Sequence, residues 1–277
     1  MKSLFIQLPQ GRLHYLDNRR SGPVVILLHG NSSAAAAFTE QFAELGEHYR
    51  LLAVDWPGHG QSDALPPADY SFSGYADVLV AFVRQMQLHD FALVGHSLGG
   101  HAAIEALPRL TGARGLILLG APPFNSQLAA QLFHPEPTGG LVFQAALDNP
   151  QVTRLAKAFI SQGNSTEHLL ATLAHFIRAT DPNVRSALGA SLATGAFADE
   201  VALLATSGVP TLLLQGQNDA FINASSCTPQ VFSPAPVQVV QLSDCGHCPH
   251  SEIPHLCNDL MHNFISALYE NSPCKLL

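Results

Sequence analysis

The chain has 277 residues, a length that suits one large α/β domain or a core domain carrying a modest insertion. Hydrophobic residues make up 47% and charged residues only 12%, a balance that excludes intrinsic disorder. Thirteen Lys and Arg against 21 Asp and Glu give a formal net charge of −8, so nucleic acid is not expected as a partner.

Neither a membrane span nor a secretion signal is expected. The longest apolar runs, such as 24–28 and 116–119, are far shorter than the roughly 18 residues that a spanning helix needs. The first ten residues have no h-region long enough for a signal peptide. The five cysteines all lie at or after Cys227, unlike a disulfide framework spread through a small secreted fold. We therefore expect a cytoplasmic protein with reduced thiols and no membrane partner.

In chain order, the first 120 residues alternate short apolar runs with longer amphipathic ones. An opening hairpin is predicted from runs 5–8 and 12–17. Leucine-rich or β-branched runs, each followed by a turn with Gly or Pro, predict buried parallel strands at 24–29, 50–54, 91–94 and 115–119. Helical spacing of apolar residues predicts helices at 36–48 and 73–87. The pattern is that of repeated βαβ units.

From residue 122 to about 205 the strand signals vanish. Helices are predicted there at 153–162, 166–180 and 184–194. Strands return at 210–215 and 237–242, and an amphipathic helix at 254–269 closes the chain. The sequence thus predicts a core made of residues 1–121 and 206–277, with a helical insertion at 122–205.

A nucleophile is predicted at Ser97. The segment Gly95-His96-Ser97-Leu98-Gly99 lies between the predicted strand at 91–94 and a predicted helix. On such a turn the serine is strained and its hydroxyl projects from the carboxyl end of the strand. Serine is a poor nucleophile until a base takes its proton, so a histidine oriented by a carboxylate is required.

His247 and Asp219 meet that requirement best. His247 follows the strand at 237–242 and Asp219 follows the strand at 210–215, so both belong at carboxyl ends of strands. The chain order Ser, Asp, His is typical of one hydrolase architecture. Four other histidines that lie near glycines are alternative candidates for the base, but backbone packing explains the presence of each equally well: His29, His59, His96 and His101.

Two backbone N–H groups are expected to stabilise an oxyanion. One is that of Leu98, directly after the nucleophile, and the other is that of Asn31, in the loop after the strand at 24–29. The Asn31 amide could also hold a substrate oxygen. The alternative is that Asn31, Ser32 or Ser33 only caps the following Ala-rich helix.

These motifs together resemble the α/β-hydrolases. The resemblance rests on His29-Gly30-Asn31, Asp55 to Ser62, Gly95 to Gly100, Asp219, and Gly246 to Pro249 with Glu252 and Pro254. It implies an α/β fold with a mostly parallel eight-stranded sheet flanked by helices, and residues 122–205 as a cap over the pocket. It also implies Ser97 as nucleophile, His247 as base, Asp219 as its orienting acid, and Asn31 and Leu98 as oxyanion donors, with no cofactor.

Within that family, segments 29–33, 57–60 and 120–124 resemble the serine-type N-acyl-homoserine lactonases. His96, which precedes the nucleophile, is common to many general esterases and does not support the narrower assignment. An apolar acyl pocket could be lined by His96 and by phenylalanines of the cap, although these would also serve as cap core: Phe133, Phe143, Phe159 and Phe176.

A metal site is not expected. Cys245 and Cys248, with His250, His255 and Cys257 nearby, are residue types that bind zinc. However, the second Cys-x-x-Cys pair of a structural zinc site is missing and His247 is needed as the base. The thiols are expected to pack as small hydrophobes.

The sequence therefore predicts a metal-independent serine hydrolase that cleaves a small-molecule carboxylic ester or lactone through an acyl-enzyme. One alternative is a C–C hydrolase, acyltransferase or perhydrolase on the same triad, because fold and triad do not choose the substrate. The other is a ligand receptor of hydrolase fold with negligible turnover. Oligomeric state does not follow from the sequence.

Overall fold

The computed structural model describes residues 1–135, 138 and 140–270. Its centre is an eight-stranded sheet with the order β1-β2-β4-β3-β5-β6-β7-β8. The first two strands form an antiparallel hairpin and β2 pairs antiparallel with β4, whereas every other pairing is parallel. The strands are β1 (Lys2–Leu8), β2 (Gly11–Asp17), β3 (Val24–Leu28), β4 (Arg50–Val54), β5 (Phe91–His96), β6 (Ala113–Leu119), β7 (Thr211–Gly216) and β8 (Val237–Leu242).

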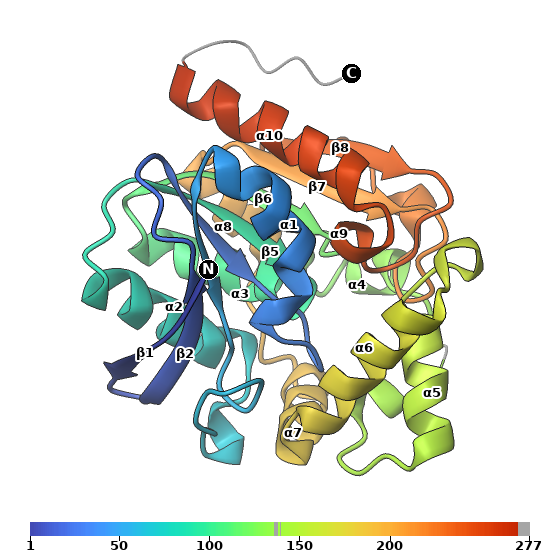
Figure 1. Ribbon diagram of the computed structural model, residues 1–277. Coiled ribbons are helices and arrows are strands. Elements are labelled where there is room, and N and C mark those ends of the chain that lie inside the picture. Colours follow the sequence, from blue (N-terminus) through green and yellow to red (C-terminus); the bar gives the residue numbers. More distant parts are fainter. Residues whose placement is uncertain (136–137, 139, 271–277) are drawn as a thin grey trace.

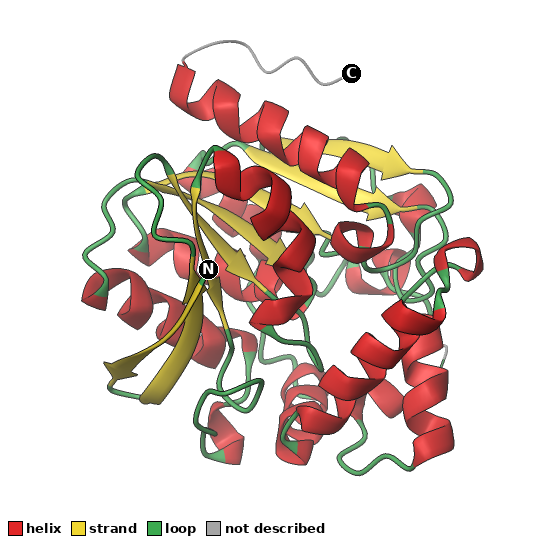
Figure 2. Ribbon diagram, viewed as in Figure 1, coloured by secondary structure: helices red, strands yellow, loops and turns green. Residues whose placement is uncertain are grey.

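Helices cover both faces of the sheet (Figures 1 and 2). Along β3, Val25 and Leu27 pack into one apolar cluster, while Ile26 and Leu28 pack into another, because successive side chains of a strand point to opposite faces. Helices α1 (Thr39–Glu44) and α10 (Pro254–Glu270) cover the first face. Helices α2 (Phe72–Gln85), α3 (Leu98–Ala106) and α8 (Glu200–Ser207) cover the second. A strand buried on both sides needs this continuous apolar sequence.

A third apolar cluster lies outside the sheet, in the helical insertion. The insertion contains α4 (Ala129–Leu132), α5 (Asn149–Ala158), α6 (Glu167–Ala179) and α7 (Pro182–Ala193). Leu155, Phe159 and Ile177 pack there against Cys248, which belongs to the loop before α9 (Pro249–Glu252). The insertion therefore packs directly beside His247.

Several helix boundaries differ from those expected. The predicted helix at 36–48 is only α1 with a 3₁₀ turn on each side. Helix α5 begins at Asn149, because Asp148 caps it and exchanges hydrogen bonds with Gln151 in a capping box. Asp181 caps α7, which begins at Pro182, two residues before the predicted start. The prediction missed α8 because its apolar residues form no single stripe.

Helix α8 packs with the core rather than with α5 and α6. Its residue Leu204 belongs to the apolar cluster of α2 and α3, and the Glu200 carboxylate lies 3.0 Å from Nδ1 of His101 on α3. In the described part of the chain, no helix is long and apolar enough to cross a bilayer.

Candidate active site

Ser97 lies on the sharp turn between β5 and α3. Its φ of 48° and ψ of −119° place a non-glycine residue in the left-handed half of backbone space, a costly conformation that persists only when its surroundings impose it. Those surroundings include a hydrogen bond from the Ser97 N–H to the Leu119 carbonyl oxygen, 3.0 Å. The Ser97 hydroxyl makes no hydrogen bond with the described residues and lines a pocket together with His247.

Two glycines make this turn possible. A Cβ at Gly95 would lie 2.5 Å from the Cα of Gly100, and a Cβ at Gly99 would lie 2.2 Å from the carbonyl oxygen of Leu28. Either contact is far below van der Waals distance. Glycine therefore lets α3 approach β3 and β5 closely enough to hold Ser97 at the edge of the sheet.

His247 and Asp219 form a buried hydrogen-bonded pair. Nδ1 of His247 lies 2.7 Å from Oδ2 of Asp219, so the proton belongs on Nδ1 and Nε2 is left as the acceptor. The carboxylate also accepts hydrogen bonds from the N–H groups of Phe221 and Ile222 and from the Gln215 amide. Asp219 is thereby fixed on the loop after β7, and it orients the imidazole.

The loop after β3, residues 29–33, lies beside Ser97. The Asn31 side-chain amide donates one hydrogen bond to the Val142 carbonyl oxygen in the insertion, and the Asn31 backbone N–H has no partner among the described residues. Trp56 holds this loop by donating its indole N–H to the His29 carbonyl oxygen, and Ser32 donates its N–H to Nε2 of His59. The Leu98 N–H is in the first turn of α3, where backbone donors have no partner inside the helix.

A pocket of about 320 Å³, here called the Ser97 pocket, contains Ser97, His247, Asn31 and Leu98. Three of the four predicted cap phenylalanines line it, namely Phe133, Phe143 and Phe159, together with the further aromatic rings of Phe72, Phe124, Phe197 and Phe221. His96 also lines it. The walls are therefore mainly apolar, with the polar groups gathered around Ser97.

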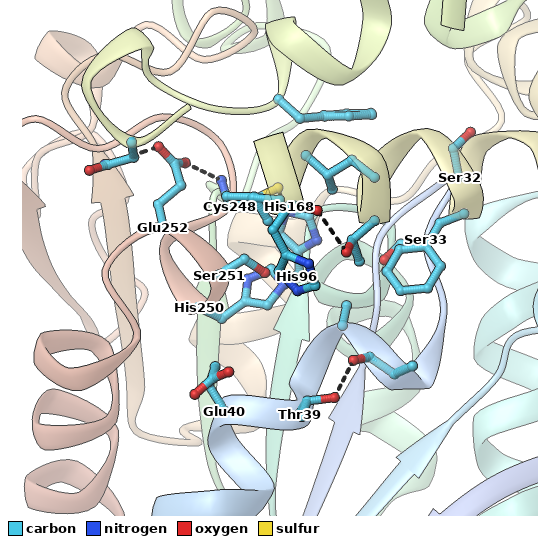
Figure 3. Close-up of a pocket in the computed structure, with 18 of the residues that line it drawn as sticks. Ser32, Ser33, Thr39, Glu40, His96, His168, Cys248, His250, Ser251 and Glu252 are labelled. Atoms are coloured by element: carbon cyan, nitrogen blue, oxygen red, sulfur yellow. Dashed lines mark hydrogen bonds between the residues drawn. The ribbon is translucent and has the colours of Figure 1, made fainter. Parts of the chain in front are cut away.

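A second cavity of about 430 Å³, here called the polar chamber, adjoins the Ser97 pocket (Figure 3). The two share Asn31, His96 and Phe159. The predicted Phe176 lines this chamber instead of the Ser97 pocket. In Figure 3, His96 and His250 lie at its centre, with Glu252 on one side and Ser33 on the other.

The four histidines that are alternative candidates for the base make other contacts. His29 accepts the Trp56 N–H at Nε2, His59 accepts the Ser32 N–H, and His101 pairs with Glu200. Nε2 of His96 donates to the carbonyl oxygen of His247, 2.9 Å away. Burial lowers the pKa of His96, and it lowers the pKa of His59 and of His250 to about 3. These rings are neutral at pH 7.

Glu252 anchors the loop of His247 to the insertion. Its carboxylate accepts hydrogen bonds from the N–H groups of Gly246 and Cys248, the two neighbours of His247, and from the N–H of Ser161 in the insertion, 2.7 Å away. The N–H of His247 itself donates to the carbonyl oxygen of Phe159. The loop that carries His247 is thus attached to the insertion.

The cysteines near His247 are free and buried. Cys245 and Cys248 pack in different apolar clusters, and desolvation raises the pKa of both thiols. Among the described residues, no three side chains of the types His, Cys, Asp and Glu are grouped to hold a metal ion. Cys274 lies outside the described residues.

Comparisons with known proteins agree with this architecture. The sequence model of the alpha/beta hydrolase family matches residues 25–260. A 2-hydroxy-6-oxononadienedioate/2-hydroxy-6-oxononatrienedioate hydrolase of Klebsiella pneumoniae is 27% identical, over 95% of this chain and 96% of that protein. The hydrolase of the same name from Escherichia coli is 26% identical, over 92% of this chain and 91% of that protein.

Solved structures of a lactonase and of an esterase are also similar to this chain. A mutant of the N-acyl homoserine lactonase AidH, complexed with N-hexanoyl homoserine lactone, superposes with a TM-score of 0.87 at 25% identity, covering 98% of this chain and 99% of that one. A thermophilic esterase from Thermogutta terrifontis has a TM-score of 0.78 at 21% identity, covering 97% and 99%. The latter likeness shows the shared fold alone.

Proposed function

Because the chain belongs to the alpha/beta hydrolase family, we propose that it is a serine hydrolase cleaving a carboxylic ester or lactone through an acyl-enzyme on Ser97. The observation that carries the proposal is the buried pair of His247 and Asp219, with His247 lining the same pocket as Ser97, whose backbone is strained and whose hydroxyl has no partner among the described residues. In this arrangement Nε2 of His247 is the free acceptor that Ser97 requires.

The proposed reaction has two halves. Ser97 Oγ bonds to the substrate carbonyl carbon while its proton passes to Nε2 of His247, and the oxyanion accepts hydrogen bonds from the Leu98 and Asn31 N–H groups. The carbon–oxygen bond to the leaving group then breaks, and the leaving oxygen takes the proton from His247. Water repeats these steps on the acyl-enzyme and releases the acid, which restores Ser97.

The aromatic lining of the Ser97 pocket supports an apolar acyl group. Its rings include Phe133, Phe143 and Phe159 from the insertion. Such surfaces bind hydrocarbon through the hydrophobic effect and offer few groups for a charged chain. The acyl-homoserine lactonase among the structural relatives makes a lactone the first cyclic substrate to assay.

A second candidate is hydrolysis of a carbon–carbon bond, which the names of the two curated relatives favour. Those names describe dicarboxylate substrates. Among the described residues, however, neither the Ser97 pocket nor the polar chamber is lined by Lys or Arg. The buried guanidinium of Arg185 donates instead to the carbonyl oxygens of Gln144, Ala145 and Ile177 and to Ser32 Oγ. This favours an uncharged ester over a dianion.

The test is product analysis with four substrates, using the purified protein and its Ser97→Ala variant. The substrates are a short-chain aryl ester, an alkyl ester, an N-acyl-homoserine lactone and a vinylogous 1,5-diketone dicarboxylate. We expect Ser97-dependent release of acid from an ester or the lactone. Cleavage of the diketone alone would favour the C–C hydrolase, and tight binding without product would favour a receptor. Turnover that persists in Ser97→Ala would overturn the mechanism.

A further inference from the structure

The polar chamber lies beside the catalytic base. It shares Asn31, His96 and Phe159 with the Ser97 pocket, and the rings of His96 and Phe159 also contact the His247 ring, with centroids 5.1 and 5.9 Å away. His247 must deliver a proton to the leaving oxygen. The chamber is therefore next to the point at which the leaving group departs from the acyl carbon.

Two imidazole rings, those of His96 and His250, line one side of the chamber. His250 is 1% exposed, and its ring makes no hydrogen bond with any described residue. The rings of His96 and His250 have centroids 4.6 Å apart, and Nδ1 of His96 also lacks a partner. Both Nδ1 atoms are buried, so a ligand in the chamber meets the other edges of these two rings.

The walls carry further polar side chains, of which His168 is exposed and Ser251 half-buried. The hydroxyls of Ser33 and Ser251 and the ring of His168 line the chamber and make no side-chain hydrogen bonds within the described residues. Each hydroxyl donates and accepts, and each neutral imidazole has one donor and one acceptor nitrogen. Together these groups match a ligand that carries several hydroxyl groups.

Charge excludes an anionic ligand. The chamber has no Lys or Arg among its described lining residues, and its charged side chains are the carboxylates of Glu40 and Glu252. The oxygens of Glu252 are already occupied by backbone N–H donors. A carboxylate placed there would lose its hydration and gain no cation.

We propose that the polar chamber binds the alcohol half of the substrate, and that this alcohol is small, uncharged and rich in hydroxyl groups, as glycerol is. The inference rests on the proposed function, because a substrate has an acyl half and an alcohol half only if it is an ester. The apolar acyl chain then occupies the Ser97 pocket, and the carbonyl carbon lies between the two cavities at the oxyanion loop. This division favours linear esters over lactones, whose leaving oxygen stays tethered to the acyl group.

The test compares three butanoate esters that differ only in the alcohol: glycerol, propanol and glycolate, the last bearing a carboxylate. We expect kcat/KM for glyceryl monobutanoate to exceed that of propyl butanoate by about tenfold, since two net hydrogen bonds stabilise to that extent. The glycolate ester is expected to be the poorest of the three. Equal kcat/KM values for the glycerol and propyl esters would overturn the proposal.

Two variants test whether the alcohol binds in the chamber: one fills the chamber with a larger side chain, and the other is a matched control. Thr172 on α6 lines the chamber, and its neighbour Ala171 is exposed on the same helix. Thr172→Phe is expected to abolish the preference for the glycerol ester while propyl butanoate is still hydrolysed. Ala171→Phe is expected to leave the preference unchanged. A preference that survives in Thr172→Phe would place the alcohol elsewhere.

A second measurement separates failure of this proposal from failure of the proposed function. The ¹⁵N resonances of the histidine rings are followed while glycerol is added to the Ser97→Ala protein, which needs no turnover. We expect concentration-dependent shifts of the His250 ring that are absent in a protein also carrying Thr172→Phe. If no ester is hydrolysed yet His250 shifts, the ester mechanism fails and the glycerol site stands. If His250 does not respond, the chamber proposal fails.

Discussion

The ring of His247 and the backbone around it are held by residues far apart in the chain. Asp219 accepts from Nδ1, His96 donates to its carbonyl oxygen, Phe159 accepts from its N–H, and Glu252 binds the N–H groups on both sides of it. A base held this firmly needs no reorganisation before it accepts a proton. Two of these contacts give predictions at the scale of single residues.

Asp219→Asn should lower kcat by about 10⁴-fold, as loss of the orienting carboxylate does in serine hydrolases. The amide no longer stabilises the imidazolium that forms when His247 takes the Ser97 proton. The measurement is steady-state kinetics with the best ester, with circular dichroism to verify folding. A decrease of less than tenfold in folded protein would show that Asp219 is not the orienting acid.

Glu252→Ala should lower kcat roughly 10- to 100-fold with little change in KM, because a small displacement of a catalytic group costs about that much. Three backbone N–H groups lose their acceptor, namely those of Gly246, Cys248 and Ser161. Glu252→Gln, which keeps one acceptor oxygen, should recover part of the rate. If kcat falls only in proportion to the unfolded fraction, Glu252 has a purely structural role.

At the scale of elements, the close contact between β3 and α3 positions the nucleophile. Gly99→Ala should destabilise the protein by about 1–3 kcal/mol, the usual cost of overpacking, because the new Cβ would lie 2.2 Å from the Leu28 carbonyl oxygen. Gly163→Ala in the insertion is the control, since nothing lies within 4 Å of a Cβ there. Chemical denaturation measures both, and equal stability of the two variants would contradict this packing.

The elements that sequence alone predicts are those whose pattern is local. The strands around residues 24–28 and 91–96 follow from uninterrupted apolar runs, and the turn at Ser97 follows from its glycines. Helix α8 is not predicted because its apolar residues form no single stripe, although Asp199 and Gly208 cap its ends. The contact of Glu252 with Ser161 and the polar chamber bring together segments that are far apart in the chain, which no local pattern reveals.

At the scale of the whole molecule, buried neutral histidines link stability to pH. Burial lowers the pKa of His59 and His250 to about 3 in the folded state, whereas the unfolded chain has the ordinary value near 6.5. Between these values the unfolded state binds more protons than the folded state. Stability is therefore complete above about pH 6.5 and is lost as the pH falls from there towards 3.

The expected loss at pH 5 is about 2 kcal/mol for each of these two histidines, as an order of magnitude. Denaturant titrations at pH 7.5, 6 and 5 measure it. His250→Leu removes one titrating ring and should flatten the dependence by about 1.4 kcal/mol per pH unit below pH 6. A free energy of unfolding that stays constant from pH 7.5 to 5 would show that these rings are not buried as neutral groups.

The proposed activity depends on one covalent bond, between Ser97 Oγ and the acyl carbon. The most direct measurement is mass spectrometry of protein quenched by acid during turnover of a short-chain ester, in wild type and in Ser97→Ala. We expect the mass of one acyl group on the peptide that contains Ser97, and none on the variant. An unmodified Ser97 peptide during rapid turnover, or an equally active Ser97→Ala protein, would contradict the assignment of Ser97 as the nucleophile.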